Sequence, residues 1–225
     1  MPKLYVVGTP IGNLEDMTLR AIRILKEVDI VLCEDTRLTR KLLSKYEIST
    51  KTLSYSSDDP SKSNAIIEML RQGKNLALVS DAGTPAISDP GSVLVKNIKE
   101  ALRDEVEIVT VPGPSALTAF LSIAGLPVAE FTFLGFLPHK KGRETLFKEI
   151  ALSERAMVFY ESPHRILKTL ESLKLYLHDS EKTVIIGREL TKVYEEVLEG
   201  SPEELLVHFK DNPEKVRGEF VVLVG

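Results

Sequence analysis

The sequence predicts an α/β protein with a mainly parallel sheet in its first half and a mixed sheet in its second half. Segments typical of strands and helices alternate about five times from the start of the chain. Loops rich in Gly and Pro follow several of the expected strands. In the second half, strands follow one another more often, which a purely parallel sheet does not allow.

Composition sets limits on the class of protein. With 225 residues, 43% hydrophobic and 28% charged, the chain is globular rather than disordered, collagenous or a disulfide scaffold. The net charge of −4 counts against a uniform basic face, although a local patch still permits RNA binding. Cys33 is the only cysteine, which excludes an internal disulfide and a cysteine zinc cluster. We expect no metal site, no membrane span and, since no signal peptide is visible, a cytoplasmic protein.

The first half is expected to contain five strands separated by helices. Short apolar runs rich in β-branched residues predict the strands, and apolar residues at helical spacing, such as Leu19, Ile22 and Leu25, predict the helices. Gly73 stands where a helix should end. The expected order is strand 3–7, helix 18–26, strand 30–33, helix 38–46, strand 52–55, helix 61–72, strand 76–80, helix 92–102 and strand 107–111.

The second half is expected to be a mixed α/β domain. Ser201 and Glu204 have the spacing of a capping box, with Pro202 between them at the first helical position. Ser162 is a good N-cap, and Pro163 a good first helical residue. The expected order is helix 115–124, strand 131–136, helix 141–150, strand 156–160, helix 162–175, strands 183–187 and 195–198, helix 201–209 and strand 219–224. We place the domains at 1–114 and 115–225, with a linker around 115–127.

Three Gly/Pro loops point to one ligand site. The segments 8–13, 81–91 and 112–115 follow the first, fourth and fifth strands, and the carboxyl ends of parallel strands share the edge where open α/β folds bind ligands. Neither the dinucleotide fingerprint nor the P-loop pattern is present. Asp81, with few basic neighbours, favours a ribose, sulfonium or ammonium group over a triphosphate. Each loop taken alone is also compatible with an ordinary turn.

Eight ordered motifs resemble those of the ribosomal RNA small subunit methyltransferase I family, which belongs to the tetrapyrrole-methylase superfamily. They extend from the first strand to the end of the chain. The motifs are VVGTPIGNLED (6–16), EDTR (34–37), VSDAGTPAISDPG (79–91), VPGPSA (111–116), GFLP (135–138), FYESPHR (159–165), RELTK (188–192) and GEFVVLVG (218–225).

The resemblance implies a two-domain fold of the class III methyltransferases, with S-adenosylmethionine in a cleft between the domains, and a homodimer. The implied activity is 2′-O-methylation of a decoding-centre cytidine ribose in 16S ribosomal RNA. Many members continue past the last motif with a small basic helical tail, whereas this sequence stops at Gly225. We expect this difference to affect RNA affinity more than cofactor binding. The alternatives are a methyltransferase for a tetrapyrrole or another small molecule, and a non-enzymatic RNA-binding or ribosome-assembly module.

The resemblance also assigns cofactor-binding positions. They lie on the three loops, at the start of the following helix and, for adenine, on two strand ends of the second domain. The positions are Pro10, Gly12, Asp81, Gly83, Ala86, Ile87, Ser115, Ala116, Tyr160 and Leu190.

Candidates for catalysis are acidic groups that would accept the proton of a ribose hydroxyl, and cations that would stabilise its alkoxide. Asp35, Glu34 and Glu161 are the acids, and Arg37 and Arg188 the cations. The sequence does not rank them. Asp35 is equally suited to cap a helix, and Arg188 to form a structural ion pair.

Candidates for RNA contact are basic or polar residues near these loops. His164 and Arg165 fall in the expected first turn of a helix, where cations are unfavourable unless an anion binds there. The alternative to an anion site is that these residues pair with Glu161. For the basic run that follows the GFLP motif, the alternative to RNA contact is an ordinary solvated surface. The candidates are Asn13, His139, Lys140, Lys141, Arg143, His164 and Arg165.

Overall fold

The chain forms two compact units, Met1–Ser115 and Ala116–Gly225. The computed structural model describes residues 1–56, 59–127 and 129–225. In these ranges, no helix combines the length and the apolar character that a membrane span requires.

The first unit contains a five-stranded sheet in the order β3-β2-β4-β1-β5, and every neighbouring pair of strands is parallel. The predicted parallel sheet is therefore confirmed. Its elements are β1 (Lys3–Val7), α1 (Leu19–Glu27), β2 (Ile30–Cys33), α2 (Thr36–Lys45), β3 (Lys51–Ser54), α3 (Pro60–Arg71), β4 (Leu76–Leu78), α4 (Gly91–Leu102) and β5 (Glu107–Val111).

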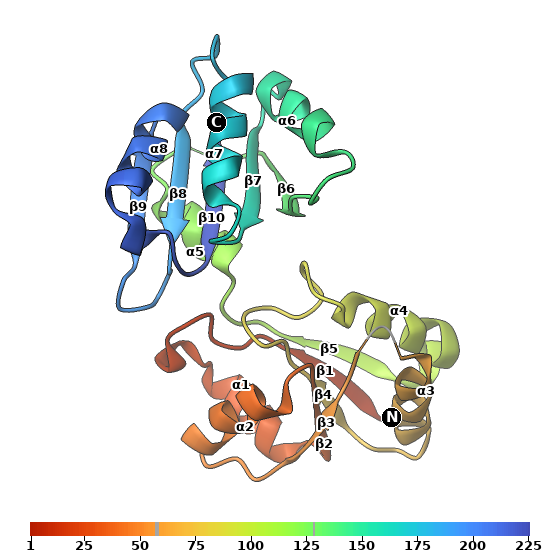
Figure 1. Ribbon diagram of the computed structural model, residues 1–225. Coiled ribbons are helices and arrows are strands. Elements are labelled where there is room, and N and C mark those ends of the chain that lie inside the picture. The colour runs from red at the N-terminus through yellow and green to blue at the C-terminus, as the bar shows by residue number, and fades with distance from the viewer. Residues whose placement is uncertain (57–58, 128) are drawn as a thin grey trace. The chain divides into compact units, whose positions relative to one another are not determined.

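Helices cover both faces of this sheet, as Figure 1 shows. On one face, Ile24 and Leu25 of α1 and Leu43 of α2 share a buried cluster with strand residues. On the other face, α3 and α4 pack through residues such as Ile66 and Leu94. Helices on both faces bury all sides of the central strands, which explains why β4 consists of buried apolar residues alone.

The second unit contains a mixed sheet in the order β6-β7-β10-β8-β9. The β6–β7 pair is parallel, and the other neighbouring pairs are antiparallel, as predicted. Its elements are α5 (Ala116–Ile123), β6 (Phe131–Phe136), α6 (Arg143–Leu152), β7 (Ala156–Glu161), α7 (Ile166–Tyr176), β8 (Val184–Arg188), β9 (Glu196–Gly200), α8 (Pro202–Asp211) and β10 (Phe220–Val224).

The two faces of the second sheet are covered differently. Residues of α6, α7 and α8 share one large buried cluster with the strands. Helix α5 packs elsewhere on the sheet, where a Cβ atom built on Gly187 would lie 2.6 Å from Cδ2 of Phe120. Glycine at this position in β8 therefore allows α5 to approach the sheet closely.

The helix expected to begin at Ser162 begins at Ile166 instead, so this prediction is wrong by one turn. The carbonyl of Ser162 accepts the N–H groups of Arg165 and Ile166, both at 3.0 Å, and these residues form a separate turn. The carboxylate of Glu161 accepts the N–H of Ser162 at 2.7 Å. Arg165, and not Ser162, stands at the N-cap position of α7.

Candidate functional site

The loops after β1 and β4 are joined by a two-way backbone hydrogen bond. The N–H of Thr9 donates to the carbonyl of Gly83 at 2.9 Å, and the N–H of Gly83 donates back at 3.1 Å. The buried Thr9 hydroxyl also donates to the carbonyl of Ser80 at 3.1 Å. Gly83 has φ 81°, a left-handed conformation that favours glycine. Pro10, which follows Thr9, is thereby fixed next to the loop of Gly83.

The loop after β5 packs directly against the loop after β1. A Cβ atom built on Gly8 would lie 2.8 Å from Cα of Gly113, and one built on Gly113 would lie 2.8 Å from the carbonyl oxygen of Gly8. The hydroxyl of Thr84 donates to the carbonyl of Pro114 at 3.1 Å, next to Ser115. The three Gly/Pro loops therefore meet at one edge of the first unit.

The loop after β2 adds carboxylates to this edge. The N–H of Asp35 donates to Oδ1 of Asp81 at 3.2 Å. The Asp35 side chain caps α2 by accepting the N–H of Arg37 at 2.7 Å, and it forms an ion pair with the Arg37 guanidinium at 2.7 Å. These bonds hold the pKa of Asp35 well below its usual range. Asp35 therefore stays ionised and is a weak proton acceptor, whereas Arg37 is largely exposed.

Glu34 has the opposite electrostatic environment. Partial burial, a hydrogen bond with Asp89, and the negative charges of Asp89 and Asp81 raise the pKa of Glu34 to about 7. A carboxyl group that gains or loses its proton near neutral pH has the property required of a general base. Among the acidic candidates, Glu34 is the one whose surroundings favour proton transfer.

Asp89 has a structural role that the sequence analysis did not assign. Its Oδ1 accepts the N–H of Gly91 at 2.6 Å and the N–H of Ala86 at 3.1 Å. Ala86 and Ser88 have φ 70° and 55°, and these hydrogen bonds support that unusual backbone. An aspartate two residues before a glycine at the start of a helix was the signal in the sequence. Asp89 thus shapes the loop that carries Ala86 and Ile87, both predicted cofactor contacts.

The remaining first-unit candidates lie at the surface or on the loop after β1. Gly12 and Asn13 are exposed. The side chain of Asn13 accepts the N–H of Glu15 at 3.0 Å and caps a short turn of 3₁₀ helix. Asn13 therefore stabilises its own loop in this structure.

Tyr160 and Leu190, the predicted adenine contacts, belong to the second unit. Tyr160 lies among aromatic rings, with ring centroids 5.0 Å from Phe133 and 5.4 Å from Phe136. Leu190 is buried and follows β8. Ala116 is the first residue of α5.

Glu161 lies at the centre of a buried network. Its Oε1 accepts from Nε of Arg165 at 2.7 Å, and its Oε2 accepts from the hydroxyl of Thr169 at 2.7 Å. Arg143 donates to the same hydroxyl at 2.7 Å and lies 3.7 Å from Oε2 of Glu161. The exposed side-chain fraction is 0% for Glu161, 16% for Arg143 and 15% for Arg165. In this structure the three charged groups are paired with one another and with Thr169, and little of their side chains is exposed.

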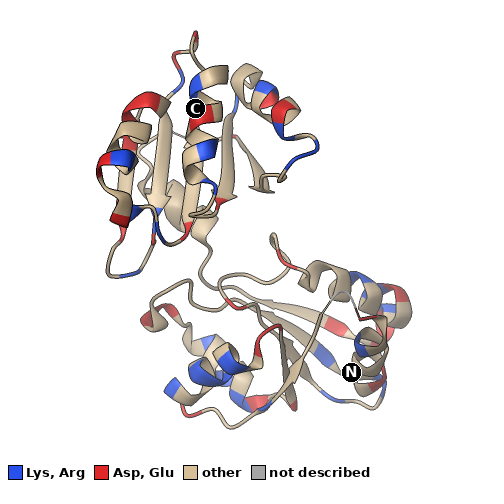
Figure 2. Ribbon diagram, in the orientation of Figure 1, with Lys and Arg blue, Asp and Glu red and all other residues tan. Residues whose placement is uncertain are grey.

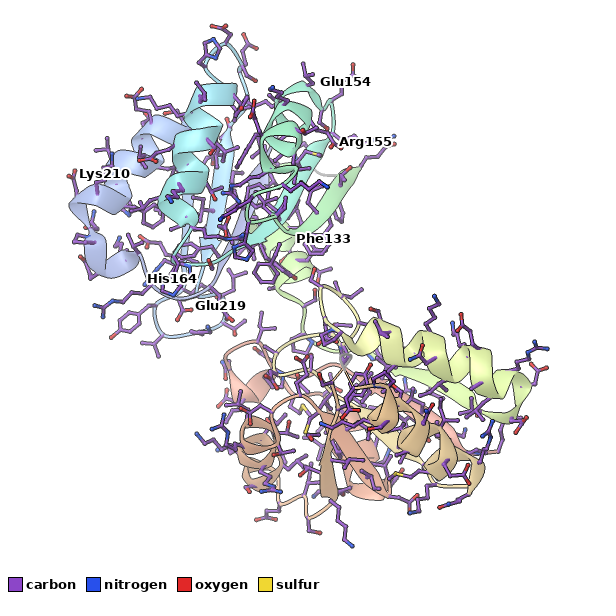
Figure 3. The ribbon with its side chains drawn as sticks, turned by 45° about the vertical axis from the view of Figure 1, so that its right-hand side comes forward. Phe133, Glu154, Arg155, His164, Lys210 and Glu219 are labelled. Atoms are coloured by element: carbon purple, nitrogen blue, oxygen red, sulfur yellow. The ribbon has the colours of Figure 1, made fainter. Side chains whose placement is uncertain are left out.

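The two arginines of this network also fix the loop after β6. Arg165 donates to the carbonyl of Leu137 at 2.8 Å, and Arg143 donates to that of Pro138 at 3.2 Å. The next residues along the chain, His139, Lys140 and Lys141, are exposed. His164 is exposed as well, on the turn between β7 and α7 (Figure 3).

Arg188 is also a structural residue. Its guanidinium donates to the carbonyls of Arg217 and Tyr194, both at 3.1 Å, and 9% of its side chain is exposed. Glu196 lies 3.9 Å away. The side chain thus ties the segment after β8 to the segment before β10. Within the described ranges, no group of three or more His, Cys, Asp and Glu side chains is arranged to hold a metal ion.

Comparisons with known proteins show the family to which the chain belongs. Residues 3–206 match the model of the tetrapyrrole (corrin/porphyrin) methylases. The Thermotoga maritima protein named ribosomal RNA small subunit methyltransferase I is 45% identical over 226 residues, which cover 100% of this chain and 99% of that protein. The protein of the same name from Leptospira biflexa is 47% identical over 227 residues, covering 99% and 90%. The chain belongs to the ribosomal RNA small subunit methyltransferase I family.

Solved structures show that this family member has the fold of the tetrapyrrole methylases. A cobalt precorrin-4 methyltransferase aligns with a TM-score of 0.70 and 18% identity, covering 99% of this chain and 94% of that one. Uroporphyrin-III-C-methyltransferase from Thermus thermophilus aligns with a TM-score of 0.69 and 21% identity, covering 100% and 94%. At this level of identity the likeness is one of fold alone.

Proposed function

We propose that the chain transfers the methyl group of S-adenosylmethionine to the ribose 2′-oxygen of a decoding-centre cytidine in 16S ribosomal RNA. Full-length relatives at about 45% identity that carry the name of rRNA methyltransferases support the reaction class and the RNA substrate. The ribose assignment comes from the family resemblance, and Glu34, a carboxyl group beside the three joined loops whose pKa is raised to about 7, is a group that would serve such a transfer as a base.

The residues at the loop edge suit S-adenosylmethionine. Asp81 is exposed and is charge-complementary to a sulfonium ion, and its carboxylate also accepts hydrogen bonds from ribose hydroxyls. The strained backbone from Gly83 to Ala86 is braced by Thr9, Thr84 and Asp89, so the loop is preorganised. When bound, the cofactor supplies an electrophilic methyl group. Tyr160 and Leu190 remain the expected adenine contacts, from the family resemblance.

Glu34 is the proposed general base. In its ionised form the carboxylate accepts the proton of the 2′-hydroxyl, which increases the nucleophilicity of that oxygen. A base with a pKa near the working pH combines a useful ionised fraction with proton affinity. Asp35 is held ionised by Arg37, and Glu161 is saturated by donors within its own unit. Neither is as well suited to accept a proton.

The exposed residues His139, Lys140, Lys141 and His164 stay the proposed RNA contacts of the second unit. Arg143 and Arg165 act in this proposal by holding the loop that carries the first three. A homodimer remains part of the proposal because the family resemblance implies it, and a cytoplasmic location remains an expectation from the sequence.

The decisive experiment is a methylation assay with tritiated S-adenosylmethionine on unmodified small ribosomal subunits and on free 16S rRNA, followed by mapping of the modified nucleotide. We expect methyl incorporation on one ribose. Incorporation on a base would overturn the ribose assignment, and incorporation into a tetrapyrrole but not into RNA would favour a small-molecule methyltransferase. Calorimetry of S-adenosylmethionine binding to wild-type chain and to Asp81→Ala tests the cofactor site separately, since unchanged affinity would remove Asp81 from it.

A further inference from the structure

Helix α2 carries an unbalanced positive charge. Its sequence, TRLTRKLLSK, contains Arg37, Arg40, Lys41 and Lys45 and no acidic residue, so basic residues gather on this helix in a chain whose net charge is −4 (Figure 2). Positions four apart on a helix are neighbours, and like charges there destabilise it. The pairs 37/41 and 41/45 have this spacing. The helix dipole favours Lys45 in the last turn, and Arg40 donates to the hydroxyl of Thr52 at 3.3 Å, so it is the excess of positive charge on the helix that calls for an explanation.

Some cations on other helices have an acidic partner on the same helix. Arg23 pairs with Glu27 in α1, Lys96 with Glu100 in α4, and Lys148 with Glu144 in α6. On α2, Arg37 pairs with Asp35. Arg40, Lys41 and Lys45 form no ion pair with any residue in the described part of the chain, and all three are exposed.

A hollow of about 400 Å³ is lined by one of these cations, Arg40. It is formed by the second half of α2, the segment that leads into β3 and the first two residues of β3. Leu43 and Ile48 supply buried apolar surface, and Arg40, Lys51 and the hydroxyl residues Ser44 and Ser49 supply polar groups. Cations and hydroxyl donors together are the side chains that contact nucleic-acid phosphates.

The position of α2 connects this hollow to the proposed reaction. The helix begins at its cap Asp35, whose N–H donates to Asp81, and Glu34 precedes that cap. From there α2 leads to Arg40, Lys41 and Lys45. A polynucleotide whose target ribose lies beside Glu34 would find successive cations along the helix, at the rise of about 1.5 Å per residue of an α-helix.

We infer that the exposed face of α2, together with the hollow lined by Arg40, Ser44, Ser49 and Lys51, is a second RNA-binding surface that binds the phosphate backbone flanking the methylated nucleotide. The inference rests on the proposed function, because it takes RNA as the substrate. It assigns to the first unit a binding role that the sequence analysis gave mainly to residues of the second. Since these contacts are to phosphates, they add affinity and orientation and little sequence selectivity.

The test compares R40Q/K41Q/K45Q with a control, K96Q/K99Q/K210Q, which removes the same charge from exposed positions on α4 and α8, including Lys210 (Figure 3). Arg37 is left intact because it pairs with Asp35. Binding to a 16S rRNA transcript and to unmodified small subunits is measured across a series of KCl concentrations. Calorimetry measures S-adenosylmethionine affinity, and circular dichroism confirms that each variant is folded.

For the α2 variant we expect at least about a tenfold loss of RNA affinity near 100 mM KCl, and a salt dependence shallower by about 2–3 in the slope of log K against log salt. S-adenosylmethionine affinity should be unchanged, and the control should bind RNA like the wild type. Wild-type RNA affinity in the folded α2 variant would overturn this inference and leave the proposed function intact. A loss restricted to subunits, with transcript binding unchanged, would identify a ribosomal protein as the partner and also overturn it. Failure of the wild-type chain to bind either probe would overturn the proposed function and this inference together.

Discussion

The backbone N–H of Asp35 donates a hydrogen bond to Oδ1 of Asp81 at 3.2 Å. This bond joins the loop after β2 to the loop after β4, which are neighbours in the sheet. It places Glu34, the preceding residue, close enough to Asp81 and Asp89 for their charges to raise its pKa. The acidic group with a raised pKa at this edge therefore depends on the loops after two strands, β2 and β4, that are far apart in the sequence.

Glu34→Gln should lower kcat by about 100-fold or more, the usual size of a general-base contribution. In the wild type, log kcat should rise with pH up to about 7 and then level off, because the ionised carboxylate is the active form. The variant should lose that dependence while it keeps its affinity for S-adenosylmethionine. Initial rates from pH 5.5 to 8.5 provide the measurement. A wild-type profile that is flat across this range would contradict the role of Glu34.

The same residue should make stability depend on pH. Because its folded-state pKa is raised from 4.5 to about 7, the folded state binds the proton more tightly, and stability present below pH 4.5 is lost as pH rises through 7. Partial exposure of Glu34 reduces this effect by solvent screening to about 1 kcal/mol. Urea unfolding at pH 5 and pH 8 should show this loss in the wild type and in the control Glu105→Gln, but not in Glu34→Gln.

Asp89→Asn should distinguish the effect of the negative charge of Asp89 from the effect of its hydrogen bonds to the loop. The amide oxygen of asparagine retains an acceptor for the N–H groups of Ala86 and Gly91, but it removes a negative charge from beside Glu34. The midpoint of the pH–rate profile should therefore shift to lower pH with little loss of stability. Asp89→Ala should in addition cost about 1–3 kcal/mol in the free energy of unfolding, because the loop N–H groups lose their acceptor. An unchanged midpoint in Asp89→Asn would contradict the electrostatic coupling.

Gly8→Ala should weaken both stability and cofactor binding. The new methyl group would meet the backbone of Gly113 at 2.8 Å, so the loops after β1 and β5 must separate, at a cost of about 1–3 kcal/mol. Gly73→Ala is the matched control. That position has φ 85° but no atom within 4 Å of a new Cβ, so it should cost about 1 kcal/mol and leave S-adenosylmethionine affinity unchanged. Equal affinities in the two variants would argue against the joined loops as the cofactor site.

Glu161→Ala should destabilise the second unit without changing the chemistry. It removes the counter-charge of two nearly buried guanidiniums, Arg165 and Arg143, and breaking a buried ion pair costs about 3–5 kcal/mol. Thermal unfolding measures this loss. If a temperature exists at which the variant is folded, its pH–rate profile there should match that of the wild type. A profile altered like that of Glu34→Gln would instead assign Glu161 to catalysis.

Much of the fold follows from local patterns in the sequence. Alternating apolar runs and helical periodicity predicted the parallel sheet, and Gly8, Gly83 and Gly113 marked loops that the structure brings together. Pairing of Arg165 with Glu161 was an alternative that the sequence left open, and the structure shows it, but the burial of Arg143 and Arg165 was not predictable from periodicity. It depends on Glu161 and Thr169, and hydrogen bonds between separate elements leave no periodic signal. The start of α7 was misplaced for the same reason, because a side chain of the preceding strand fixes that turn.

The site was predictable in its position but not in its electrostatics. Asp81 and Glu34 are recognisable as acids at strand ends. Only the structure shows that partial burial and the neighbouring Asp89 and Asp81 raise the pKa of Glu34, whereas hydrogen bonds with Arg37 lower that of Asp35. The basic residues of α2 are visible in the sequence. The structure is needed to show which cations of this helix and of other helices form ion pairs.

The position of β10 has a consequence for biosynthesis. The last strand, Phe220–Val224, lies between β7 and β8 and pairs with both, whereas the first sheet is complete once Val111 has been made. Domains generally fold in order as they emerge during translation. The nascent chain can thus form its first sheet early, while β7 and β8 are not joined until β10 has left the exit tunnel. A chaperone that shields apolar strands would have its main opportunity during that interval.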